Sequence, residues 1–414
     1  MIRQVTTVFV TAWVLVLAVH FSPVASAASQ TVSGKAYNRL NEAQELMGAK
    51  QIDQAVIVLE TLLSEGASDS LDRALTLQTL GYAEMSRERF PDAIKHLRAS
   101  LDTGLLPEKV KYNVGYMVAQ LYAAQEQFDE ALLFAKDWFA TLVDPNPNQM
   151  IFMANIFAQT KRYDEAIPYA ERAIAATDKP KESWFQLLTA AAFELKDYDV
   201  AVSSLKRMVT LWPNQPEYWE QLASVLVVQE REPEALAALK LAWHLEVLQK
   251  ESSIKSLVQL AITRGVPEHA ARLIESAFEQ KLLPRDAEYV DLLGNSWVAA
   301  RESDQAIEAF TELSALEDSG EGLARVASLH LEAGRLDLAE ESLERAIEAG
   351  LEEPGKAWLL LGIVLAEQQS FTRSFEALRM AAGFDATRKQ ATRWLSYAED
   401  MRKQQEWQAR YGSS

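Results

Sequence analysis

The chain contains no cysteine, and this absence excludes several kinds of chemistry at once. Disulfide bonds, zinc-thiolate sites, thiol catalysis and a lipid-modified N-terminal cysteine all need a sulfur atom that the sequence does not provide. Proline and glycine are also scarce, with 13 and 16 residues among 414. Together with abundant Ala, Leu and Glu, this scarcity is typical of a helical chain that buries a large continuous core.

Motifs for catalysis, cofactor binding and metal binding are also missing from the sequence. The histidines after residue 27 are far apart and fit no His-Glu-x-x-His or similar ligand spacing: they are His96, His244, His269 and His330. There is no Gly-rich phosphate loop, no Gly-x-Ser-x-Gly elbow and no calcium-binding loop. Carboxylate pairs such as Glu340-Glu341 are explained more simply as solvated helix faces than as general acids and bases. We therefore expect no catalytic residue, no cofactor and no metal site.

The charge balance is strongly negative, with 59 acidic and 41 basic residues and a formal net charge of -18. Such a charge repels phosphate backbones and anionic lipid surfaces, so nucleic-acid binding and non-specific membrane binding are both disfavoured. An acidic surface would favour basic segments of partner proteins. The solubility of a long helical chain explains the same charge equally well.

The first 27 residues differ from the rest of the chain. Arg3 gives a positive start, residues 8–19 form an apolar run, and Ala25-Ser26-Ala27 ends in small residues, which is the pattern of a secretory signal peptide cleaved after Ala27. A membrane anchor is the weaker alternative, because a span needs roughly 18 to 20 apolar residues. We expect a periplasmic or extracellular protein that does not insert directly into the membrane after removal of the signal peptide.

A four-residue pattern recurs through the remainder of the chain. A large apolar residue and two mostly polar residues precede a small residue at the start of an amphipathic helix, as in Phe128-Asp129-Glu130-Ala131, and the pattern is looser in later units, as at Glu232 to Ala235. The small residue recurs at positions 55, 93, 131, 166, 201, 235, 270, 306, 339 and 374, in steps near the 34-residue period of a helix-turn-helix unit. A second small residue, such as Gly81 or Gly362, lies twelve positions earlier in most units. Two helices can cross closely there, because a larger side chain would push them apart.

These positions resemble the tetratricopeptide repeat family, most clearly at Trp219-Leu222-Ala223-Ala235 and at Trp358-Leu361-Gly362. The resemblance covers almost the whole chain after residue 27. It implies an all-α fold, namely a tetratricopeptide-like, right-handed superhelical solenoid of about ten helical hairpins with a C-terminal capping helix. Departures from the pattern around residues 258–265 indicate a bend that divides the array into two arms.

We therefore expect a signal peptide over residues 1–27, a first arm over 28–245, a second arm over 246–384, and a capping helix and tail over 385–414. Trp394, Leu395, Ala398, Met401 and Trp407 have helical spacing, which predicts that this last helix covers the open apolar end of the array. A helix that docks a partner is the alternative.

The resemblance further implies that the first helices of successive hairpins line a concave groove. Carried over position by position, it places these partner-binding residues in the groove: Asn113, Tyr116, Gln120, Asn148, Ile151, Asn155, Gln186, Phe193, Glu220 and Ser224. Amide side chains both donate and accept hydrogen bonds, so they suit the backbone of an extended peptide. The matching positions of the first arm lack the Lys and Arg of a carboxylate clamp. In the alternative interpretation, the amides only keep the surface soluble.

The second arm carries a more charged set at the equivalent positions: Asp291, Asn295, Arg325, Ser328, Lys356 and Leu359. Phrases such as Tyr112-Asn113-Val114-Gly115-Tyr116 are similar to tetratricopeptide proteins associated with TonB energy-transduction systems of Gram-negative bacteria. This similarity implies a non-enzymatic periplasmic scaffold for protein-protein interaction, accessory to TonB-dependent uptake, that binds extended peptide segments or helices of envelope proteins. The alternative function is an assembly factor or scaffold for an outer-membrane secretion or polysaccharide-export complex.

Overall fold

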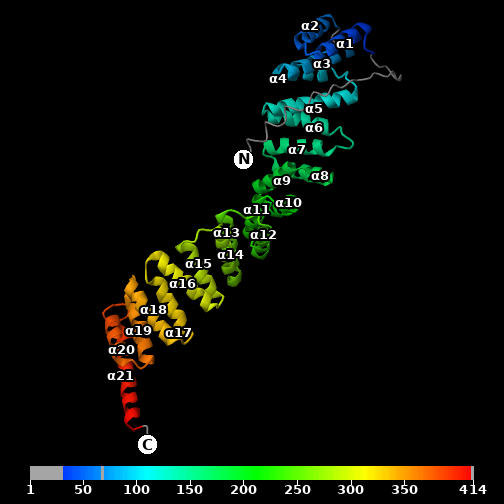
Figure 1. The fold of residues 1–414 in the computed structure, drawn as a ribbon. Helices are drawn as coiled ribbons and strands as arrows, with labels where there is room; N and C mark the ends of the chain where they lie inside the picture. The colour runs from blue at the N-terminus through cyan, green and yellow to red at the C-terminus, as the bar shows by residue number, and fades with distance from the viewer. Residues whose placement is uncertain (1–30, 67–69, 412–414) are drawn as a thin grey trace. The chain divides into compact units, whose positions relative to one another are not determined.

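The computed structural model describes residues 31–66 and 70–411, and these residues form twenty-one α-helices and no β-strand (Figure 1). The predicted all-α fold is therefore confirmed. The predicted signal peptide, residues 1–27, lies outside the described residues. No helix within the described ranges is long and apolar enough to cross a membrane.

The chain divides into two compact units between Met208 and Val209, within α10 (Tyr198–Leu211). Besides the first part of α10, unit 1 contains α1 (Gly34–Gly48), α2 (Ile52–Glu65), α3 (Leu71–Ser86), α4 (Phe90–Asp102), α5 (Glu108–Ala124), α6 (Phe128–Phe139), α7 (Pro147–Gln159), α8 (Tyr163–Ala175) and α9 (Glu182–Leu195). Unit 2 contains α11 (Pro216–Val228), α12 (Glu232–His244), α13 (Glu251–Thr263), α14 (Pro267–Glu279), α15 (Ala287–Ala299), α16 (Ser303–Glu317), α17 (Glu321–Glu332), α18 (Leu336–Ala349), α19 (Pro354–Glu367), α20 (Phe371–Ala382) and α21 (Arg388–Tyr411). The predicted division into arms after residue 245 stays a prediction.

Consecutive helices form ten hairpins, from α1 with α2 to α19 with α20, and every hairpin turn has the same backbone geometry. One residue in each turn has a positive φ: Lys50, Glu88, Glu126, Lys161, Lys196, Glu230, Gly265, Arg301, Gly334 and Gln369. The N–H of the next residue donates to the carbonyl oxygen five positions earlier, as from Arg89 to Glu84 at 2.9 Å. This is a helix C-cap of the Schellman type. Ten copies of one turn at the predicted spacing confirm the repeat register.

The small residues of the repeat pattern mark the closest approach of the two helices in a hairpin. All ten residues at the start of the second helices, from Ala55 to Ser374, are at most 1% exposed. A Cβ atom built on Gly362 would lie 2.5 Å from Leu378 Cγ, and one built on Gly294 would lie 2.5 Å from Phe310 Cε1. A side chain at these positions would therefore overlap the second helix, as the sequence predicts.

The last helix, α21, covers the end of unit 2 with only part of its length (Figure 1). Ala391 and Ala398 are buried in a cluster with Leu378, and Trp394 packs against it. The prediction that Trp407 shares this packed face is wrong, because its side chain is 61% exposed. Six residues separate Trp407 from Met401, a rotation of about 240° around the helix, so Trp407 lies on another face.

Candidate functional site

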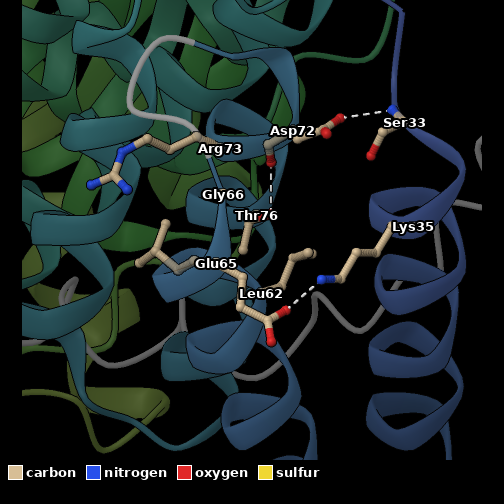
Figure 2. Close-up of a pocket in the computed structure, with 9 residues that line it drawn as sticks. Ser33, Lys35, Leu62, Glu65, Gly66, Asp72, Arg73 and Thr76 are labelled. Atoms are coloured by element: carbon tan, nitrogen blue, oxygen red, sulfur yellow. Dashed lines mark hydrogen bonds and ion pairs between the residues drawn. The ribbon is translucent and has the colours of Figure 1, made fainter.

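Small-molecule pockets are poorly developed in the described part of the chain. The cavity between α1, α2 and α3 has a volume of about 180 Å³ and is crossed by polar contacts (Figure 2). Lys35 Nζ lies 2.8 Å from Glu65 Oε2, and the Ser33 N–H donates to Asp72 Oδ1 at 2.9 Å. Pockets for organic ligands usually measure about 300 to 1,000 Å³, so this cavity is small. A second hollow of about 450 Å³ lies at the turn between α17 and α18, but it is wide open to solvent; it is lined by Gly334, Arg335, Leu336, Asp337, Leu338 and Gln368. The candidate site is therefore sought on the open faces of the hairpins.

Among residues 31–66 and 70–411, no group of three or more His, Asp or Glu side chains is placed to hold a metal ion.

In unit 1, an aromatic cluster joins the first helices of two neighbouring hairpins. The ring of Tyr116 on α5 stacks on Trp138 of α6 with centroids 4.2 Å apart, and it meets Phe152 of α7 edge-on at 4.9 Å. Such aromatic pairs contribute about 0.5 to 1.5 kcal/mol beyond the burial of their area. Burial raises the pKa of Tyr116 to about 12, so its hydroxyl keeps its proton at neutral pH. The cluster fixes α5 beside α7 and places a hydrogen-bond donor there.

The predicted amides lie on α5, α7 and α9 with different exposures. Asn113, Asn148 and Gln186 are exposed, whereas Gln120 and Asn155 are half-buried. The Asn155 amide donates one N–H to the carbonyl oxygen of Ile151 at 2.9 Å. Its other N–H and its oxygen remain available to a partner.

The remaining predicted residues are less accessible or lie elsewhere. The Ile151 side chain is only 7% exposed, so it packs in the core and offers a partner little area. Tyr116 and Phe193 are half-buried. Glu220 and Ser224 lie on α11, which belongs to unit 2.

In unit 2, the first helices are linked by charged and polar contacts. Glu220 Oε1 of α11 accepts a hydrogen bond from the Ser253 hydroxyl of α13 at 2.6 Å, and Lys250 Nζ lies 3.6 Å from Glu220 Oε2. The charge of Glu220 is the main cause that raises the pKa of Lys250. The buried Tyr289 of α15 donates to Glu251 of α13 at 2.8 Å. Carboxylates on this face are thus held by donors from the next helix.

The charged set predicted for the second arm is partly brought together. The side chain of Asn295 donates to Asp291 at 3.0 Å, and Arg325 of α17 forms an ion pair with the same carboxylate. The sequence analysis missed Glu251, Ser253 and Tyr289. The sequence signal that could have found them is a pair of polar residues 33 to 38 positions apart, because this spacing joins one first helix to the next.

Family models identify tetratricopeptide repeats in two parts of the chain. Models of the tetratricopeptide repeat match residues 149–183 and 327–391. A solved tetratricopeptide repeat protein from Parabacteroides merdae is 12% identical, with 64% of this chain and 99% of that chain covered and a TM-score of 0.37. YrrB, described as a tetratricopeptide protein with an unusual peptide-binding site, is 13% identical, with 47% and 94% covered and a TM-score of 0.37. MamA AMB-1 is 20% identical, with 44% and 95% covered and a TM-score of 0.36.

No curated protein matches the chain. The family models and the ten hairpins of the described residues together identify the architecture as an all-α array of tetratricopeptide-like repeats, with matched repeats in unit 1 and in unit 2.

Proposed function

We propose that this chain is a non-catalytic scaffold for protein-protein interaction, and that unit 1 binds an extended peptide segment along α5, α7 and α9. Tetratricopeptide repeats generally hold protein partners, and matched repeats support that role here. The observation that carries the proposal is the series of solvent-accessible amides on neighbouring first helices, namely Asn113, Gln120 and Asn148.

The chemistry of these residues selects the kind of segment. Amides pair with the peptide backbone whatever its sequence, and each such hydrogen bond contributes a net free energy of about 0.5 to 1.5 kcal/mol to binding. The half-buried rings of Tyr116 and Phe152 add a small apolar contact beside the amides. The predicted contact positions in unit 1 carry no Lys or Arg to neutralise a terminal carboxylate. The bound segment is therefore internal to its own chain.

Titration of a partner, identified first by crosslinking, tests this proposal. The variant Asn113→Ala, Gln120→Ala, Asn155→Ala removes three amides and should weaken binding by about 1.5 to 4.5 kcal/mol. Neutral contacts are little affected by salt, so the loss should be similar at low and high ionic strength. The control is Gln54→Ala, Gln127→Ala, Ser203→Ala, which changes exposed uncharged side chains on or next to second helices of unit 1. Equal affinity of the triple amide variant and the wild type, with unchanged circular dichroism, would refute this site.

We also propose that the scaffold is exported and acts in the cell envelope as an accessory to TonB-dependent uptake. Support comes from Arg3, from the apolar run of residues 8–19 and from the small residues ending at Ala27, together with the phrases similar to TonB-associated tetratricopeptide proteins. The mature protein should begin at Ala28 and fractionate with soluble periplasmic contents. Met1 retained in a membrane fraction would contradict export.

The uptake role has its own measurement. Deletion of the gene should lower energised uptake of iron complexes, and the triple amide variant should fail to restore it. Normal uptake in the deletion strain would reject the TonB role, whereas titration alone decides whether unit 1 binds peptide.

A further inference from the structure

The last helix, α21, reverses the charge of the chain locally. It carries six Lys and Arg against three Asp and Glu, a net charge of +3, in a chain whose net charge is -18. Net charge predicts that the whole chain is repelled by anionic surfaces. Within one Debye length, which is about 8 Å at physiological ionic strength, a helix of opposite sign overrides that average.

The basic residues of α21 lie mainly on the face opposite its packed side. The packed side has helical spacing and includes Ala391, Trp394 and Ala398. Positions 389, 393, 396, 400, 403, 407 and 411 also follow each other in steps of three or four, so they form one stripe on the other side. We call this the outer stripe: Lys389, Arg393, Ser396, Asp400, Lys403, Trp407 and Tyr411, together with Arg410 at its border, all of them exposed.

The cations of the outer stripe are mostly unpaired. Lys403 Nζ lies 3.4 Å from Glu399 Oε1. The other ion pairs of α21 involve Arg388 and Arg402, and none in the described residues involves Lys389, Arg393 or Arg410. Their side chains are exposed in the part of the chain that the structure describes.

Exposed aromatic rings accompany the cations. Trp407 and Tyr411 are 61% and 62% exposed with ring centroids 5.9 Å apart, and Tyr397, beside the stripe, is 52% exposed. Leaving two large neighbouring rings in water is unfavourable, since apolar burial is worth about 25 cal/mol per Å². A partner that binds this face must therefore be complementary both to positive charges and to flat amphipathic rings.

We propose that the outer stripe of α21 binds an anionic lipid surface, with the helix lying flat among the headgroups. Lys and Arg are attracted to anionic lipids, and Trp and Tyr prefer the headgroup level of a bilayer. The stripe contains no Leu, Ile, Val, Phe or Met, so it adheres to the surface without entering the hydrocarbon core. Arg, Trp and Tyr are also enriched at protein interfaces, whereas Lys is depleted there, so an acidic protein surface is the competing occupant.

Vesicle flotation of residues 28–414 tests the proposal, because this chain lacks the apolar run of residues 8–19. The vesicles contain either equal parts of phosphatidylglycerol and phosphatidylcholine or phosphatidylcholine alone. Wild type should float with the anionic vesicles only, and less as salt rises. The stripe variant Lys389→Gln, Arg393→Gln, Arg410→Gln should lower the partition coefficient about tenfold or more. Trp407→Ser with Tyr411→Ser should lower it as well.

The matched control removes the same charge elsewhere in unit 2, through Arg272→Gln, Arg345→Gln, Arg379→Gln on α14, α18 and α20. These exposed side chains lie outside the stripe, so the control should float like wild type. Three results would overturn the proposal. They are no flotation of wild type with anionic vesicles, equal flotation of the stripe variant, and an equal loss in the control. A dimer in solution that the stripe variant abolishes, without vesicle binding, would identify a second copy as the occupant instead.

Discussion

Replacing Gly362 of α19 by alanine tests whether the hairpins are as tightly crossed as the structure indicates. The new Cβ would lie 2.5 and 2.6 Å from Leu378 Cγ and Cδ2, and 3.1 Å from the Leu378 backbone nitrogen. Leu378 is fully buried, and the Gly362 carbonyl accepts a hydrogen bond from the Ser374 hydroxyl at 2.7 Å, so neither side can move freely. Overpacking costs about 1 to 3 kcal/mol. Alanine gains about 1 kcal/mol of helix propensity over glycine, which leaves a net destabilisation of about 0 to 2 kcal/mol.

Gly115 provides the matched control in the interior of another first helix, α5. It is also buried, but a Cβ there meets only Trp138 Cβ at 3.8 Å, an ordinary van der Waals contact. Gly115→Ala should therefore stabilise the protein by about 0.5 to 1 kcal/mol. The two substitutions are chemically identical and are expected to differ in sign.

Urea unfolding followed by circular dichroism measures both effects, and a double-mutant cycle identifies the cause. Leu378→Ala alone should cost about 2 to 5 kcal/mol. Combined with Gly362→Ala, it should cost less than the sum by about 0.5 kcal/mol or more, because the new methyl group fills part of the vacated space. Additive changes, or a stabilising Gly362→Ala equal to Gly115→Ala, would refute the close crossing.

Three further substitutions test other parts of the structure. Burial lowers the pKa of His330, so the unfolded chain binds protons more readily, and the free energy of unfolding should fall as pH drops below about 6.5. His330→Leu should flatten this dependence in thermal melts between neutral and mildly acidic pH. An unchanged slope in the variant would contradict this prediction. Trp138→Ala should destabilise unit 1 by about 3 to 5 kcal/mol and lower the pKa of Tyr116 by exposing its ring, as spectrophotometric titration would detect. Glu126→Gly should raise the free energy of unfolding by up to about 1 kcal/mol, and the urea midpoint with it, because a φ of 59° strains any residue with a side chain; a lower midpoint would count against this turn geometry.

The positions of the helical hairpins could be predicted from the sequence, because two helices that cross closely admit only small residues at fixed positions. Ala55, Ala131 and Ser374 are therefore visible as a period without any structure. The left-handed turns were not predictable, because Lys50 or Glu126 gives no sign of a positive φ; the helix C-cap hydrogen bonds impose it.

The helices that carry the candidate site residues could be predicted from the sequence, but the exposure of each side chain could not. The resemblance to tetratricopeptide repeats placed Asn113 and Asn148 on first helices, where they are exposed. It could not show that Ile151 turns into the core, since that depends on the angle between neighbouring helices and on the size of the rings between them. The links between first helices in unit 2, such as Ser253 to Glu220, join residues far apart in sequence and emerge only when the helices are stacked.

The central claim is that partners bind along the first helices of unit 1, and position-resolved photocrosslinking in cells tests it most directly. A photoreactive residue placed at Asn113 or Asn148 should give a discrete protein adduct, and unlabelled wild type should compete it away. The same residue placed at Leu133 of α6 or Glu171 of α8, both exposed on second helices, should give none. Adducts that form equally or preferentially at Leu133 and Glu171 would contradict binding on the first-helix face.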